Sequence, residues 1–396
     1  MSLPRGRMQK QFTTGTHRAV APSETLARIK PFFAEIGITR LANVTGLDSI
    51  GIPVAQAVRP NSKSLSVSQG KGATLDCALV SAAMESIEGY HAEQISGPVH
   101  IASYQDLRRR SFPLADPYRL PANQAISFRP DRPIAWIEGY DWTRRQPVWA
   151  PFDLVHLDFT VGRRVLDSGF EPSSSGLASG NHLVEALSHA LCESIERDSV
   201  AARDPSDPTS RQRRKVALSS VDEPACGQVL EQFRSAGVEV TIWDNTSALG
   251  VPCFSAEIDE PDAGPFRRVL RAGGSGCHPC RAIALLRALT EAAQSRLTYI
   301  AGSRDDMTVD QGVRSPKVAG PPGEAPAIVS YSSVPDINFP TIDEDVQWLV
   351  SQLQACGFDQ VIVFDLTIPA FGIPVVRVLI PGLHTEKRSV TLRDSQ

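Results

Sequence analysis

One segment, residues 181–201, limits the folds open to this chain because it predicts a helix with two different stripes. Apolar residues recur from Leu183 to Ile195 at intervals of three and four, which predicts one face packed in a core. A second, largely acidic stripe of the same helix consists of Glu185, His189, Glu193 and Glu196. Like charges at this spacing repel each other unless cations lie between them. The helix is therefore expected to border a polar site.

A second predicted helix, residues 74–93, repeats the acidic pattern. Glu85 and Glu88 have the same i, i+3 spacing as Glu193 and Glu196. Two such pairs brought face to face would offer the hard oxygen ligands that Mg²⁺ prefers. Taken alone, either pair has an ordinary explanation as the solvated face of a helix.

Other polar segments suit an anion. A predicted helix over residues 281–300 carries Arg287, Glu291, Gln294 and Thr298 along one side, with Arg296 nearby. The guanidinium of Arg287 or Arg296 could bind a phosphate through two nitrogens. Residues 174–181 supply the hydroxyls of Ser174 and Ser175 and the free amides of a helix start, and Lys71 lies between two glycines. Neither G-x-x-x-x-G-K-[ST] nor G-x-G-x-x-G is present, so ATP would need another kind of site.

Composition and element order favour a large folded unit. The 396 residues are 42% hydrophobic and 21% charged, which is typical of folded proteins, and the length fits two domains or one large unit. Predicted strands alternate with helices, so we expect an α/β or mixed α+β fold. We expect irregular structure with short strands over 113–151, a glycine-rich loop over 273–276 and a mobile loop over 316–335.

Net charge, apolar runs and cysteine content indicate which binding partners and which cellular locations are compatible with this chain. A net charge of −4 gives no overall attraction to nucleic acid, and no run of apolar residues is long enough for a membrane span. The N-terminal residues lack the apolar stretch of a secretory signal, so we expect a cytoplasmic protein with reduced thiols. The thiols of Cys277 and Cys280 are either structural or incidental, or they form a relay that passes persulfide sulfur to the substrate.

Three blocks, in order, resemble the central signatures of the YcaO family. They are residues 70–74 leading to 84–88, residues 175–181 leading through Glu185 to 191–198, and residues 287–296 leading to 302–306. The resemblance implies a YcaO-type ATP-binding fold, mixed α+β with helices packed on sheets. It also implies one catalytic unit over residues 16–390, preceded by a flexible segment over 1–15.

The family resemblance implies an enzyme that uses ATP and Mg²⁺ to phosphorylate the oxygen of a peptide backbone amide. Its implied metal ligands are Glu85, Glu88, Glu193 and Glu196. With the anion-binding candidates included, the expected nucleotide-binding residues are Arg18, Thr25, Lys71, Ser174, Ser175, Asn181 and Glu185. The expected catalytic residues, facing the phosphates or supporting them, are Arg197, Arg287, Glu291 and Arg296. The family often has lysine where this sequence has Arg18.

The attacking nucleophile determines the product within this family. Sulfide gives a thioamide, a neighbouring Cys, Ser or Thr of the substrate gives an azoline, and an amine gives an amidine. Azoline-forming members tend to end in a proline-rich tail, and no proline follows Pro381 here. Residues 37–48 and 381–383 are similar to stand-alone members that work beside a TfuA protein.

We therefore expect a thioamide synthetase that hydrolyses ATP to ADP and phosphate. Its expected partners are a peptide or protein substrate, a TfuA-like protein and a second copy in a homodimer. Two alternatives remain, an azoline-forming cyclodehydratase and a non-catalytic ATP-binding accessory protein.

Overall fold

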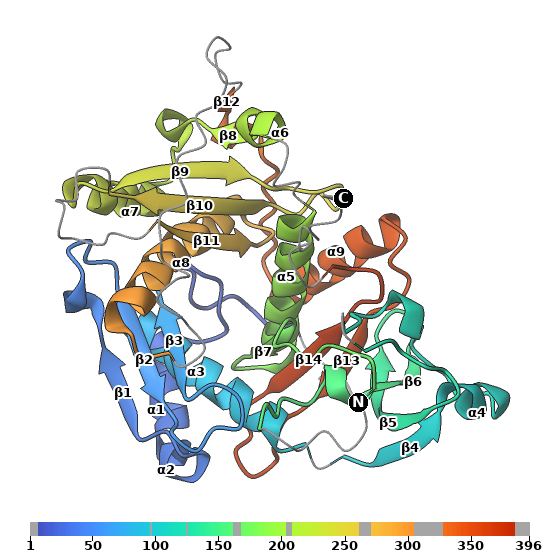
Figure 1. The fold of residues 1–396 in the computed structure, drawn as a ribbon. Helices are drawn as coiled ribbons and strands as arrows, with labels where there is room; N and C mark the ends of the chain where they lie inside the picture. The colour runs from blue at the N-terminus through green and yellow to red at the C-terminus, as the bar shows by residue number, and fades with distance from the viewer. Residues whose placement is uncertain are drawn as a thin grey trace, which may run out of the picture.

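Three sheets with helices packed on them make up the computed structural model (Figure 1). The structure describes residues 7–95, 97–123, 126–160, 168–202, 208–260, 271–304 and 328–384. The expected mobile loop therefore lies largely outside the described residues, as do the ends of the chain and of the third resembling block. None of the helices in the described part is both long and apolar enough to span a membrane.

The first sheet is a short antiparallel meander covered by helix α3 (Leu75–Glu93). Its strands are β1 (Arg40–Asn43), β2 (Val54–Val58) and β3 (Val67–Lys71). The hydroxyl of Thr74 caps α3 by accepting a hydrogen bond from the Cys77 amide. Helix α1 (Pro22–Ile29) packs on α3, and a 3₁₀ turn over 30–32 separates it from α2 (Phe33–Ile36). This break lies at Pro31, which has no amide hydrogen to continue the helix.

The second sheet carries helix α8 (Arg281–Ala301), which packs along β11 and β10. In spatial order the strands are β11 (Ala272–Cys277), β10 (Cys253–Asp259), β9 (Glu239–Asp244), β8 (Lys215–Val216) and β12 (Ile328–Val329). Helix α7 (Pro224–Ser235) lies beside α8, and the short α6 (Pro208–Arg213) precedes β8.

The predicted glycine-rich loop over 273–276 is wrong, because these residues form most of strand β11. A Cβ on Gly274 would lie 2.4 Å from the Ala288 carbonyl oxygen, and one on Gly276 would lie 2.2 Å from that of Ala284. The glycines are therefore needed for the close approach of α8 to the sheet.

The third sheet lies on the other side of the molecule and packs against α5 (Leu183–Ala201). Its strands are β4 (Val99–Ser103), β5 (Pro133–Asp141), β13 (Ile362–Asp365), β14 (Val375–Leu379) and β7 (Leu177–Ser179), with β6 (Gln146–Pro151) paired to β5. Helix α4 (Tyr104–Arg109) follows β4. The expected irregular structure is found in the described residues of 113–132, which form no strand. The strands that follow are not all short, because β5 has nine residues and buries Trp136 completely. The three prolines in β5 and β6 are compatible with pairing, since Pro133 begins β5 and Pro147 and Pro151 lie in β6, an edge strand.

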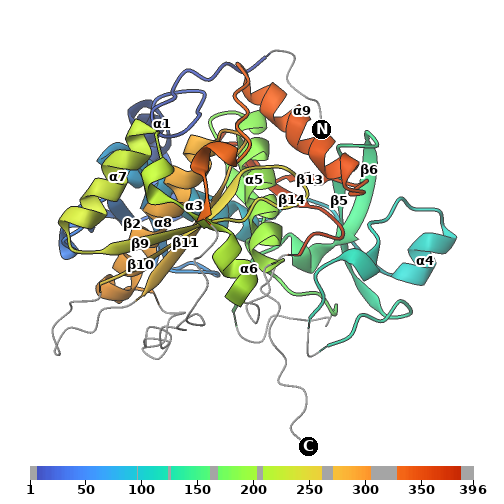
Figure 2. The ribbon, with the colours of Figure 1, turned by 90° about the horizontal axis from the view of Figure 1, so that it is seen from above.

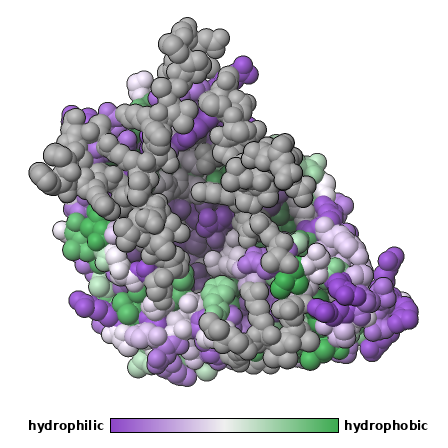
Figure 3. All heavy atoms as spheres, viewed as in Figure 1, coloured by the Kyte–Doolittle hydropathy of each residue, from purple (hydrophilic) through white to green (hydrophobic). Residues whose placement is uncertain are grey.

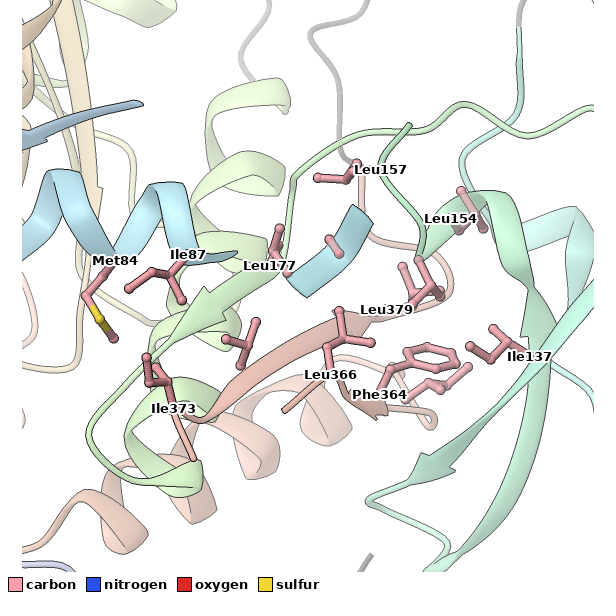
Figure 4. Close-up of a cluster of buried hydrophobic side chains, with 14 of the residues drawn as sticks. Met84, Ile87, Ile137, Leu154, Leu157, Leu177, Phe364, Leu366, Ile373 and Leu379 are labelled. Atoms are coloured by element: carbon pink, nitrogen blue, oxygen red, sulfur yellow. The ribbon is translucent and has the colours of Figure 1, made fainter. Parts of the chain in front are cut away.

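The core joins these layers. Figure 4 shows Met84 and Ile87 of α3 in the same apolar cluster as Leu177 of β7 and, further along the third sheet, Phe364 and Leu379. The predicted apolar stripe of α5 is buried as expected against β14 and the neighbouring helix α9 (Ile342–Ala355) (Figures 1 and 2). Helices α3, α5 and α8 are therefore fixed around a common centre.

Candidate active site

A cavity of about 490 Å³ lies where α3, α5 and α8 meet β3. The chain segments 14–25 and 174–181 complete its wall, and Figure 3 shows a recess at the centre of the view whose visible floor is hydrophilic. The structure brings all the predicted site residues to this cavity except Ser175 and Arg296. Those that line it are Arg18, Thr25, Lys71, Glu85, Glu88, Ser174, Asn181, Glu185, Glu193, Glu196, Arg197, Arg287 and Glu291.

Four glutamates from two helices face each other across this cavity. Glu85 and Glu88 come from α3, and Glu193 and Glu196 come from α5. One oxygen of Glu88 accepts hydrogen bonds from the Ser179 amide (2.8 Å) and hydroxyl (2.6 Å). Glu196 accepts from the Ser275 hydroxyl (2.7 Å) and the Cys277 amide (3.1 Å). These donors hold one carboxylate of each pair in a fixed position.

Burial, together with neighbouring carboxylates, raises the pKa of two of these glutamates. Burial raises the pKa of Glu88 to about 8, and Glu85 and Glu193 add to this rise although Ser179 opposes it. Burial also raises the pKa of Glu85 to about 7, with Lys71 acting in the opposite direction. A divalent cation between these groups would relieve the repulsion, and oxygen donors of this kind suit Mg²⁺. The residues present therefore fit a magnesium site.

Three of the cations that line the cavity, Lys71, Arg197 and Arg287, belong to the predicted site. The Lys71 ammonium lies 2.7 Å from Glu291, and Arg197 lies 3.4 Å from Glu193. Although burial alone would lower the pKa of Arg197, Glu193 and Glu196 raise it, so the guanidinium stays charged. Charged donors next to a magnesium site are suited to the oxygens of a polyphosphate.

Arg287, the third cation, has a partner to which sequence reasoning assigned no role. Its Nη2 donates to Nε2 of His189 at 3.2 Å. Burial, followed by the charge of Arg287, lowers the pKa of His189 well below its usual value, so the ring is neutral and able to accept this hydrogen bond. The sequence signal for His189 is its position in the acidic stripe of α5, which indicates that it faces the cavity.

Glu185 joins the start of the chain to α5. Its carboxylate accepts hydrogen bonds from the Ala19 amide (2.8 Å) and from the backbone and side chain of Asn181 (both 3.2 Å), and Arg18 lies 3.6 Å away. The Asn181 side chain in turn accepts from the Thr25 hydroxyl at 2.9 Å. These contacts form a polar part of the cavity wall in which the charges of Arg18 and Glu185 are paired with each other.

Residues 7–15, part of the segment expected to be flexible, contact α9. Lys10 lies 2.7 Å from Asp345, and the Met8 carbonyl accepts from the Ile342 amide at 2.9 Å. His17, His278 and Asp345 could in principle hold a metal ion, since one ligand atom of each lies within 4.8 Å of the others. Lys10 already neutralises Asp345, however, and Nδ1 of His278 accepts from the Cys280 amide at 2.9 Å. This cluster therefore holds the N-terminal segment in place.

Two predicted site residues are not in the cavity. Arg296 lies nine residues after Arg287, about two and a half helical turns, and so faces the opposite side of α8. There its guanidinium is bonded to Asp48 (2.8 Å) and Glu260 (2.7 Å), which corrects the prediction that it faces phosphate. Ser175 borders a separate small cavity beside Arg377, whereas its neighbour Ser174 lines the main one.

The pair Cys277 and Cys280 also lies outside the cavity. Cys277 is completely buried, and burial raises the pKa of both thiols. This arrangement favours the incidental interpretation over a sulfur relay. The cysteine that does line the cavity is Cys77, at the start of α3.

Comparison with known sequences gives a consistent result over most of the chain. Residues 69–384 match a family described as YcaO cyclodehydratase, ATP- and Mg²⁺-binding. That description contains both predicted cofactors. The chain is 37% identical over 385 residues to a Rhizobium leguminosarum bv. trifolii protein described as lying in the tfuA 3′ region, covering 93% of this chain and 89% of the relative. It is 33% identical over 380 residues to an uncharacterized protein of Methanothermobacter thermautotrophicus, covering 93% and 95%.

Solved structures share the fold. YcaO from Methanopyrus kandleri, bound with AMPPCP and Mg²⁺, has a TM-score of 0.71 and 23% identity, over 96% of this chain and 95% of that one. A heterocyclase in complex with substrate and cofactor has a TM-score of 0.78 and 23% identity, and this chain spans 54% of its length. These likenesses confirm the predicted mixed fold with helices packed on sheets.

Proposed function

Because the chain belongs to the YcaO family, we propose that it is an enzyme that converts a backbone amide of a peptide or protein into a thioamide, using ATP and Mg²⁺. The observation that carries the choice of product is the relative in the tfuA 3′ region, which matches 93% of this chain. The proposal includes a TfuA-like partner, a homodimer and a cytoplasmic location. ATP is hydrolysed to ADP and phosphate.

The geometry of the cavity supports a division of roles. Glu85, Glu88, Glu193 and Glu196 would hold Mg²⁺, which supplies positive charge that neutralises a triphosphate. The group around Asn181 and Glu185 would bind the nucleoside, together with Thr25 and Arg18.

The cations have separate tasks in this proposal. Arg197 and Arg287 remain charged inside the protein, where they would stabilise negative charge that develops during phosphoryl transfer. Glu291 holds the Lys71 ammonium at 2.7 Å, which would fix that charge for a phosphate. His189 would keep the Arg287 guanidinium in position.

Azoline formation is the second candidate product. It is favoured by the family's description as cyclodehydratase and by the fold shared with a heterocyclase. Both reactions would use the same magnesium and phosphate residues, because both activate the amide oxygen before a nucleophile attacks the carbon. They differ in whether sulfide or a side chain of the substrate is that nucleophile.

The mass of the product decides between these candidates. The protein is incubated with ATP, Mg²⁺, sulfide, a TfuA-like protein and the peptides encoded beside its gene. We expect one amide oxygen to be exchanged for sulfur, and only when sulfide is present. Loss of one water per site would mean an azoline instead. ATP binding without any hydrolysis stimulated by peptide or partner would contradict both and leave the accessory protein.

A further inference from the structure

Two neighbouring segments contribute apolar side chains to the cavity wall. They supply Leu65, from the loop between β2 and β3, and Leu157 and Phe159, from the chain that follows β6, and we call these three residues the apolar rim. Phe159 is 47% exposed, and among the large apolar residues that are exposed in the described part of the chain it is the one that lines the cavity. The others, such as Ile101 on β4, lie outside the cavity lining. The cavity therefore opens beside an uncovered aromatic ring.

Backbone hydrogen bonds hold the two segments of the apolar rim in place. The Phe159 amide donates to the Lys63 carbonyl at 2.8 Å, and the Leu157 amide donates to the Ala92 carbonyl at the end of α3 at 3.1 Å. Leu157 is buried in the same apolar cluster as Leu177 of β7 (Figure 4). Leu157 therefore anchors its segment in the core, whereas Phe159 keeps an accessible surface.

The loop between β2 and β3 is also fixed, and it adjoins the glutamates of α3. The Arg59 guanidinium lies 2.6 Å from Glu93, and both side chains are buried. The same carboxylate accepts hydrogen bonds from the Ser64 amide (3.0 Å) and hydroxyl (2.6 Å). A Cβ on Gly89 would lie 3.4 Å from the Ser64 hydroxyl oxygen, so this loop contacts α3 one residue after Glu88. The apolar rim therefore lies beside the predicted magnesium site.

The occupant that fits the apolar rim is a side chain of the peptide substrate. Successive Cα atoms of a peptide are about 3.8 Å apart, so a peptide that presents one amide to the magnesium site carries its next side chains to the adjoining wall. A leucine or aromatic side chain there would cover the Phe159 ring and remove apolar surface from water. Phosphate and ribose offer no such apolar group. The adenine base is the competing occupant, because it could stack on an aromatic ring.

We propose that the apolar rim is a specificity subsite, in which Phe159 binds an apolar side chain of the peptide substrate within about two residues of the amide to be modified. The subsite rests on the proposed function, since it assumes a peptide as the substrate. It adds the class of peptide that is selected. Peptides with leucine or an aromatic residue near the modified amide bind more tightly than peptides with only small or polar residues there.

The first test is a leucine scan of a probe peptide. Pentaglycine, acetylated at one end and methylamidated at the other, is compared with versions that carry leucine at each position in turn. Each peptide is titrated by NMR into the protein saturated with AMPPCP and Mg²⁺. At one position or more, leucine should strengthen binding to the wild type about tenfold, and Phe159→Ala should lose this gain, because the apolar partner is gone. Phe159→Leu should keep most of the gain, since its side chain remains apolar.

Ile101→Ala is the matched control. Ile101 lies on β4, is 65% exposed and does not line the cavity. This variant should show the same gain from leucine, and the same affinity for AMPPCP, as the wild type. An equal loss of the gain in Ile101→Ala and Phe159→Ala would mean that leucine adheres to apolar surface in general, which contradicts a subsite.

Other outcomes would also overturn the subsite. Leucine peptides that bind no more tightly than pentaglycine, or that do not bind at all, would show that the rim selects no apolar side chain. A gain that persists in Phe159→Ala would exclude Phe159 as the contact. A loss of AMPPCP affinity in Phe159→Ala would place the ring against the base of the nucleotide instead. Failure of the proposed function is a separate result, since the product mass can show no thioamide while the gain from leucine persists.

Discussion

Glu193→Gln should lower the affinity for AMPPCP with Mg²⁺ by at least about 100-fold, because changes that only touch the surroundings of a metal ligand already cost 10- to 100-fold. The variant keeps the shape of the side chain and removes its charge at the centre of the glutamate cluster. Titration calorimetry at several Mg²⁺ concentrations measures the effect. Without metal, the variant should unfold at a temperature no lower than that of the wild type. The reason is that Glu85 and Glu88 lose a charged neighbour that raises their pKa.

The control for this experiment is Glu231→Gln. Glu231 lies on the exposed side of α7, where it pairs with Arg234 far from the cavity lining. Surface pairs contribute little, so nucleotide affinity and stability should both be unchanged. If Glu193→Gln and Glu196→Gln bind the nucleotide as tightly as Glu231→Gln does, the magnesium site is assigned to the wrong residues.

Gly276→Ala should destabilise the protein by about 3 kcal/mol, the upper part of the range for overpacking a core. Its Cβ would meet backbone atoms of α8, 2.2 Å from the Ala284 carbonyl oxygen, and backbone cannot move aside as a flexible side chain would. Helix α8 would be pushed from β11 and would carry Arg287 and Glu291 with it. Denaturant unfolding followed by circular dichroism measures the loss, and nucleotide affinity should fall as well.

Gly227→Ala is the matched substitution in α7. Apart from its chain neighbours and the backbone of its own helix, no atom of the described residues lies within 4 Å of the position that its Cβ would take. Because glycine is a poor helix former, this change should leave stability equal or raise it by up to about 1 kcal/mol. Similar stability of Gly276→Ala and Gly227→Ala would mean that α8 does not pack on β11 as closely as described.

Local periodicity predicts the three helices around the cavity well and the glycine-rich strand β11 badly. The expected helices over 74–93, 181–201 and 281–300 match α3, α5 and α8 to within two residues at each end. The spacing of apolar and polar residues along one helix depends only on residues that are close in sequence, so it can be determined from the sequence alone. The glycines of β11 are needed because α8 packs closely against them. Strand propensity describes single residues and does not include such a contact with a distant helix.

The same distinction applies to the site. Spacing along α3 and α5 identifies both glutamate pairs, which the structure brings to one cavity. Contacts between residues that are distant in sequence could not be found in this way, such as the hydrogen bond between Arg287 and His189. Arg296 shows the converse error, because it is near Arg287 in sequence and within the same resembling block, yet its helical phase differs from that of Arg287 by half a turn.

The attachment of the N-terminal segment to α9 has a consequence for biosynthesis. Lys10 and Asp345 are 335 residues apart, yet their contact holds the segment whose next residues line the cavity. At about 5–20 residues per second, a ribosome needs roughly 20 to 70 s to progress from one to the other. Until α9 has been synthesised, the N-terminal segment cannot bind to it. The cavity is therefore completed late in synthesis, and before that chaperones can bind the residues that will line it.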